Sequence, residues 1–153
     1  MESINILSFF AGIIGTITGT CGLILSILNY TRDKPNIQIT LKWDMLPYGL
    51  ATTLFDENKL WGVVSITNVG RRPIFFSHLH LKVPGTSEYL LISDGISGEK
   101  LLEGDPPKTY PVTQEGLEKY ADHWDKIKAV VIDSTGKKYY SLPAQKKPSW
   151  AQK

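Results

Sequence analysis

The sequence predicts a mainly β protein, in which an N-terminal transmembrane helix precedes an antiparallel β-sandwich with one short helix. Between Ser3 and Thr31 there is no Asp, Glu, Lys or Arg, and an apolar run of this length can cross a bilayer as a helix. After it, short segments of alternating apolar and polar residues follow one another, with turn residues between them. The predicted transmembrane segment, linker, sandwich and polar tail span residues 1–31, 32–35, 36–143 and 144–153.

Small and polar residues fall on one face of the predicted transmembrane helix. They follow one another at spacings of three and four residues, which is the pattern of helices that pack against each other: Asn5, Ser8, Gly12, Gly15, Gly19, Gly22, Ser26 and Asn29. Association in lipid has little hydrophobic drive, so close backbone approach at Gly and Ser supplies the attraction. We therefore expect a homo-oligomer formed through this small-residue stripe.

The N-terminal run is expected to be a retained anchor rather than a cleaved signal. Its start carries Glu2 instead of basic residues, and a lipoprotein site at Cys21 is disfavoured because apolar helix continues beyond it. Arg32 and Lys34 follow the run directly, so the positive-inside rule places the C-terminal domain in the cytoplasm, below the inner (cytoplasmic) membrane. Cys21 is the single cysteine, so the sandwich has no disulfide, which favours a reducing compartment.

The first half of the sandwich contains two clear strand patterns. Residues 36–44 alternate as in a half-buried strand, with one apolar face made of Ile37, Ile39, Leu41 and Trp43. A loop follows, with a short extra element that extends to Phe55. Residues 60–69 are apolar and β-branched, which predicts a more buried strand. Residues 68–73 predict a compact turn, because Asn and Gly accept positive φ and Pro fixes the exit.

Alternation resumes at residues 74–83, where one face is predicted to hold Ile74, Phe76, His78, His80 and Lys82. Residues 89–93 predict a weaker strand, and residues 109–112 a short one. Thr113 can cap a helix that runs to Trp124, although Gly116 weakens it.

The last predicted strands form a hairpin. Residues 127–132 and 138–142 are strand-like, and residues 133–137 predict the turn between them. From Pro143 onward the chain is polar and predicts a loose tail. Trp150 in this tail is expected to contact a neighbouring protein or the membrane interface.

Two of these turn segments resemble a known group of proteins. Residues 67–74, Thr-Asn-Val-Gly-Arg-Arg-Pro-Ile, resemble a turn common in the immunoglobulin-like sandwiches of small bacterial single-pass membrane proteins. Residues 130–139 are similar to the closing hairpin of the same group. The resemblance implies an immunoglobulin-like fold and no activity.

Basic pairs in two turns form a candidate binding site for an anion. The ligand-binding residues predicted from the sequence are Arg71, Arg72, Lys137 and Lys138. Adjacent cations can grip a phosphate or a carboxylate if both loops lie at the same end of the sandwich. The plain alternative is a solvated surface, and a further one is contact with anionic headgroups of the inner leaflet.

No catalytic pattern stands out in the chain. There is no phosphate-binding glycine loop, dinucleotide fingerprint or nucleophile elbow. Residues 133–136 lack the second carboxylate element that an aspartic protease needs. His78 and His80 share a strand face, but a metal needs a third ligand, and His123 is the one other histidine. We expect no enzyme, metal or cofactor, and the net charge of +2 argues against a nucleic-acid duplex as partner.

The sequence thus favours a membrane-anchored, self-associating, non-enzymatic sensor or interaction module, whose cytoplasmic sandwich binds a ligand or a protein partner. One alternative is a ligand-gated, membrane-perturbing effector of bacterial defence, activated by an anionic signal such as a cyclic oligonucleotide. Another is a passive anchor whose partner carries the activity.

Overall fold

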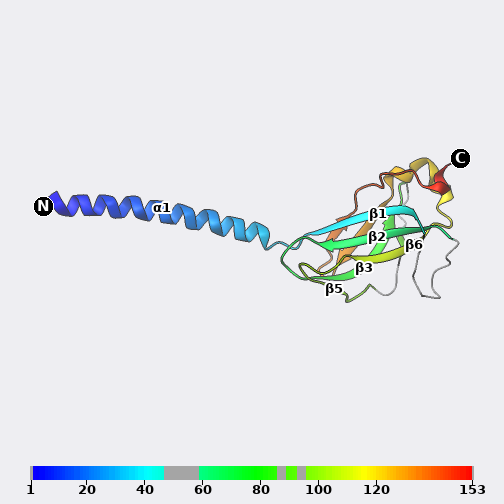
Figure 1. Cartoon of the computed structure of the whole chain (residues 1–153), viewed down its shortest axis with the longest axis horizontal. Coiled ribbons are helices and arrows are strands. Elements are labelled where there is room, and N and C mark those ends of the chain that lie inside the picture. Colours follow the sequence, from blue (N-terminus) through cyan, green and yellow to red (C-terminus); the bar gives the residue numbers. More distant parts are fainter. Residues whose placement is uncertain (1, 47–58, 86–88, 93–95, 153) are drawn as a thin grey trace. The chain divides into compact units, whose positions relative to one another are not determined.

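A computed structural model describes residues 2–46, 59–85, 89–92 and 96–152 of the chain. The chain divides into two compact units, residues 1–34 and 35–153. The first unit contains helix α1, Glu2–Arg32 (Figure 1). From Ser8 to Arg32 this helix is long and apolar enough to cross a membrane, and its residues there are exposed. This agrees with the predicted transmembrane helix.

The second unit begins with a three-stranded antiparallel sheet. Its strands are β1 (Ile37–Met45), β2 (Trp61–Asn68) and β6 (Lys108–Thr113), in the order β1-β2-β6. The alternation predicted for β1 is confirmed, since every second side chain is buried, from Ile37 to Trp43. β1 and β6 are therefore the two edges of this sheet.

The other sheet has five antiparallel strands. They are β3 (Ile74–Lys82), β4 (Tyr89–Leu91), β5 (Lys100–Leu101), β7 (Lys128–Asp133) and β8 (Lys138–Tyr140). Their order is β4-β3-β7-β8, and β5 pairs with the start of β3. The predicted closing hairpin is the β7–β8 pair.

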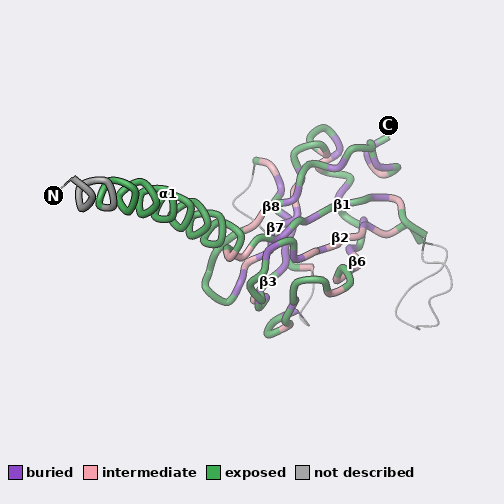
Figure 2. The backbone as a smooth tube through the Cα atoms, turned by 60° about the vertical axis from the view of Figure 1, so that its left-hand side comes forward, coloured by how far each residue is buried: buried purple, intermediate pink, exposed green. Residues whose placement is uncertain are grey.

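Apolar side chains of both sheets form one buried cluster, so the sheets are the two layers of a sandwich. Buried residues, purple in Figure 2, recur along strands of both sheets. Its fully buried members come from β2, β3 and β7 and from the segments beside them, including Val64, Ile66, Leu79, Leu101 and Val131. The structure therefore confirms a mainly β fold with an N-terminal apolar helix.

The predicted faces of β3 are wrong beyond Phe76. A register shift against β7 lies between Phe76 and His78, and such a bulge reverses which side chains point inward. The core consequently receives Ile74 and Phe76 before the bulge, and Leu79 and Leu81 after it. A simple alternation could not show this change of phase.

The predicted helix from Thr113 is shorter and of another type. Gly116 has a φ of 80°, which a regular helix does not allow, and a 3₁₀-helix begins only afterwards, at Glu118–Lys126. The Thr113 hydroxyl accepts a weak bond from the Glu115 amide at 3.3 Å instead of capping a helix.

The expectation of a loose tail is wrong for its described residues. Ser149–Ala151 form a second 3₁₀-helix, and Ala144 and Ala151 are buried. The element predicted to extend to Phe55 lies outside the described residues, as does Ser93 at the end of the predicted fourth strand.

Candidate functional site

A groove of about 440 Å³ runs between β1 and the segment that follows β8. Residues 39–45 line one side and residues 142–146 line the other. Exposed apolar side chains stand at its rim, since Leu142 is 76 % exposed and Met45 is 41 % exposed. Apolar surface around a concave site is the usual setting of a binding site.

The segment that borders the groove is fixed at both ends. We call residues 142–148 the strap. At its start, the Ser141 amide donates to the Ala129 carbonyl at 2.8 Å, and the Ala129 amide donates to Ser141 Oγ at 2.9 Å. At its end, the Ser149 amide and hydroxyl donate to the two carboxylate oxygens of Asp44 at 2.8 and 2.6 Å. The strap therefore crosses beside β1 as a held loop, with the groove beneath it.

Trp150 completes the attachment of the strap. Its ring lies edge-on to that of Trp43, with 5.6 Å between the ring centroids and 88° between the planes. This geometry is favourable for an aromatic pair. The prediction that Trp150 contacts a neighbour or the membrane is thus replaced by a contact within the domain, with a residue 107 positions earlier (150 − 43).

Trp43 lines the groove and is 93 % buried (7 % exposed). Its ring carbons Cε3 and Cζ3 face Gly62 of β2 so closely that a Cβ there would lie 2.7 and 2.6 Å from them. Within the described part of the chain no acceptor reaches Nε1 of Trp43, and none reaches Nε1 of Trp150.

The predicted basic residues lie at one end of the second sheet. β3 begins directly after the first basic loop, and β7 ends directly before the second. Antiparallel pairing brings these ends together, and the Ser134 amide donates to the Phe75 carbonyl at 2.8 Å. The fold therefore places both loops at the same end of the sheet. They carry Arg71, Arg72 and Lys137, and Lys138 follows at the start of β8.

We call this end of the second sheet, with its four predicted basic residues, the basic end. All four predicted side chains are exposed, and Lys137 Nζ lies 4.7 Å from the centre of the Tyr139 ring. Sequence reasoning missed Lys100, which pairs with Phe75 across β5 and β3 and whose Nζ lies 5.6 Å from the Phe75 ring. A two-residue strand such as β5 leaves no periodic pattern by which Lys100 could have been found.

The small-residue stripe lies on the exposed surface of α1. A Cβ added at Gly12, Gly15, Gly19 or Gly22 would meet nothing within 4 Å, which leaves room for a second backbone. The Thr16 hydroxyl donates to the Gly12 carbonyl at 2.9 Å, so it is satisfied within the helix. Ser8, Ser26 and Asn29 are exposed as well, while the side chain of Asn5 lies outside the described part.

The two strand histidines do not lie in equivalent surroundings. His78 is exposed and its Nδ1 lies 2.7 Å from Ser77 Oγ, whereas His80 is buried. Burial, and then the charges of Lys138 and His78, lower the pKa of His80, so it stays neutral at physiological pH. Among the described residues, no group of three His, Cys, Asp or Glu could hold a metal ion.

Glu99 is bound to two side chains of β6, and these contacts shift its pKa. The Tyr110 hydroxyl donates to Glu99 Oε2 at 2.6 Å, and Lys108 Nζ lies 2.9 Å from the same oxygen. The bond from Tyr110, together with Lys108, holds the pKa of Glu99 below its ordinary value against the effect of burial. Burial and Glu99 raise the pKa of Tyr110.

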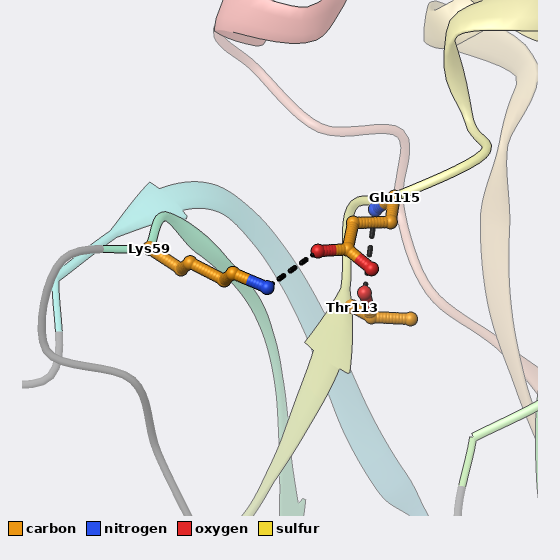
Figure 3. A network of polar contacts seen from close by, with 3 residues as sticks. All are labelled: Lys59, Thr113 and Glu115. Carbon is orange, nitrogen blue, oxygen red and sulfur yellow. Dashed lines mark hydrogen bonds and ion pairs between the residues drawn. The ribbon is translucent and has the colours of Figure 1, made fainter.

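A further polar network lies where β6 ends (Figure 3). Lys59 Nζ lies 2.7 Å from Glu115 Oε1, and the Glu115 amide donates to Thr113 Oγ1. The two charged side chains are 55 % and 72 % exposed, so the ion pair adds little to stability. We therefore interpret the Lys59–Glu115 pair as a surface ion pair and not as part of a reactive site.

No protein-family model and no curated protein matches the sequence.

Proposed function

We propose that the chain is a membrane-anchored, self-associating, non-enzymatic sensor or interaction module, whose β-sandwich binds a ligand or a protein partner. The observation that carries this proposal is the groove between β1 and the strap, with its exposed apolar rim. Helix α1 supports the membrane anchor by its length and apolar composition. The basic residues that follow α1 in the sequence support a cytoplasmic domain at the inner membrane.

The strand order supports an immunoglobulin-like sandwich. In that fold, strands A, B and E share one sheet, while C, F and G share the other, with C′ added beside C. Numbering the strands here from A gives β1-β2-β6 as A-B-E and β4-β3-β7-β8 as C′-C-F-G. Domains of this architecture commonly serve as recognition modules, so the fold is consistent with binding.

Self-association through α1 is expected to depend on the small-residue stripe. Replacing both Gly15 and Gly19 with isoleucine fills the space that a second helix needs, so the oligomer should become mainly monomeric. The measurement is the mass of the detergent-solubilised chain. The matched control replaces Thr20 and Cys21 with isoleucine, which adds bulk outside the stripe and should leave the oligomer intact. A monomeric parent chain would contradict self-association itself.

A ligand-gated effector is the second candidate function, and the basic end of the sandwich favours it. Exposed cations on two adjoining loops suit an anion such as a cyclic oligonucleotide. If this candidate is correct, adding that ligand to vesicles that contain the chain should release an enclosed dye. Replacing Arg71 and Arg72 with glutamate should abolish the release. Vesicles that stay sealed at saturating ligand would exclude cyclic oligonucleotides as the gating signal.

A further inference from the structure

β1 is the one long edge strand of the described sandwich that carries no proline. β4 and β8 have three residues each, which leaves little edge to pair with. β6 has six residues but contains Pro111, whose nitrogen cannot donate a hydrogen bond. β1 has nine residues and no proline. Short length, proline and bulges are common means of protecting an edge. The register shift of β1 against β2 lies between Lys42 and Met45, so residues 37–42 form a regular edge that is open to pairing.

The backbone of β1 presents unused hydrogen-bonding groups to the groove. The Val69 amide donates to the carbonyl of Asn36, the residue before β1. In this register, the N–H and C=O groups of even-numbered residues up to Lys42 point toward β2. Successive residues of a strand point their N–H and C=O groups in opposite directions, so those of Ile39 and Leu41 point away from β2. Both residues line the groove, and no backbone hydrogen bond from the described part of the chain reaches them.

The side chains around this edge define what could pair with it. Lys42 and Lys146 line the groove, and Asp44 is the one carboxylate among its described lining residues. Asp44 is already engaged by two bonds from Ser149. The charged groups that remain to bind an occupant of the groove are therefore the two lysines.

These charges argue against a second copy of the chain as the occupant. Pairing β1 with the β1 of another copy would bring two sets of Lys42 and Lys146 to one interface. Like charges across paired strands are destabilising, whereas opposite charges contribute favourably. An acidic strand therefore fits the groove better than a copy of β1.

We propose that an extended acidic segment of a partner protein adds to β1 as a further strand, between β1 and the strap. This inference rests on the proposed function as a binding module and specifies its partner. The segment makes main-chain hydrogen bonds to Ile39 and Leu41, as in other cases of strand addition. Its carboxylates face Lys42 and Lys146, and its apolar residues cover Leu142 and Met45.

The test uses the full chain in detergent micelles and a pool of nonapeptides that alternate Glu or Asp with Val or Ile. Bound peptide should slow amide hydrogen exchange at Ile39 and Leu41 by at least tenfold. Thr109 on the β6 edge provides the matched control amide, and its exchange should not change. Replacing Lys42 with glutamate should weaken binding of the acidic pool about fivefold, whereas Lys119→Glu, with the same charge change on the 3₁₀-helix, should not.

Two further peptide pools distinguish strand addition from binding by charge or by apolar contact alone. Peptides with lysine in place of the acidic residues, and acidic peptides with N-methylated backbones, should both fail to protect Ile39 and Leu41. Protection by either pool, equal protection at Thr109, or no protection by the acidic pool would overturn the inference. Protection that appears without peptide, as the protein mass doubles, would assign the edge to a second copy instead. A monomeric chain would count against the proposed function, whereas an oligomer without peptide protection would count only against strand addition.

Discussion

Replacing Gly62 with alanine is expected to lower the free energy of unfolding of the sandwich by about 2 kcal/mol. Within a strand, replacing glycine with alanine ordinarily raises the free energy of unfolding by roughly 0.5–1 kcal/mol, so a decrease at Gly62 is the opposite of the usual effect. It follows from the space above Gly62, where a Cβ would lie 2.6 Å from Trp43 Cζ3 and 3.3 Å from the Cβ of Val112. Contacts below 3 Å require the indole or the strand to move.

Neither partner can move freely to relieve this overlap. β2 is paired on both sides, with β1 and with β6, so its backbone is fixed by two ladders. Trp43 is buried and its ring lies against Trp150. A shift of Trp43 would therefore also disturb the strap and the groove.

A double-mutant cycle checks this explanation. Phenylalanine at position 43 removes part of the ring that faces Gly62, so Gly62→Ala should cost less than about 1 kcal/mol in the Trp43→Phe background. The measurement is denaturant unfolding of the full chain in detergent. Ser65→Ala, also in β2, serves as a control and should change stability little. Equal destabilisation by Gly62→Ala in both backgrounds would show that contact with the indole is not the cause.

The sequence contained enough local information to predict the strands but not the contacts that shape the groove. Alternation at residues 36–44 predicted which face of β1 is buried, because that face is set by the two-residue period alone. The bulge in β3 escaped prediction, since it depends on pairing with β7. The bonds of Asp44 to Ser149 join residues 105 positions apart. No local pattern marks such a contact.

At the basic end, too, the local structure could be predicted from the sequence but the contact between the loops could not. The two turns could be recognised from their residue types, and their basic side chains are visible in the sequence. Their juxtaposition follows from the β3–β7 pairing, which the strand patterns alone do not specify. Lys100 joins them because β5 pairs with β3 over only two residues.

Replacing Asp133 with asparagine is expected to lower the free energy of unfolding by about 2 kcal/mol at neutral pH. Asp133 is 6 % exposed and organises the β7–β8 turn. Its Oδ1 accepts bonds from the amides of Thr135 and Lys137 at 2.9 and 3.0 Å, and from the Thr135 hydroxyl. Its Oδ2 accepts a bond from the Tyr139 hydroxyl at 3.2 Å. An amide nitrogen in place of one oxygen donates rather than accepts, so it leaves part of this network unpaired.

The stabilisation by Asp133 should depend on pH in a defined direction. Burial alone would raise the pKa of this carboxyl, but the bonds from Thr135, Lys137 and Tyr139 outweigh it and hold the pKa below its ordinary value of 3.8. A carboxyl with a depressed pKa in the folded state stabilises fully above its unfolded pKa and loses that contribution as pH falls through the folded pKa. The difference between the parent chain and Asp133→Asn should therefore be constant from neutral pH to about pH 5 and shrink below about pH 4.

Denaturant unfolding at a series of pH values measures this difference. Tyr139→Phe provides a partial control, because it removes one donor and should reproduce only part of the loss. Burial, followed by the charge and hydrogen bond of Asp133, raises the pKa of Tyr139 to about 12, so the tyrosine stays protonated throughout this range. The acid-dependent change therefore has to come from Asp133. An Asp133→Asn chain that is as stable as the parent at neutral pH, or a difference that persists unchanged at pH 3, would contradict the role of this carboxylate in holding the turn.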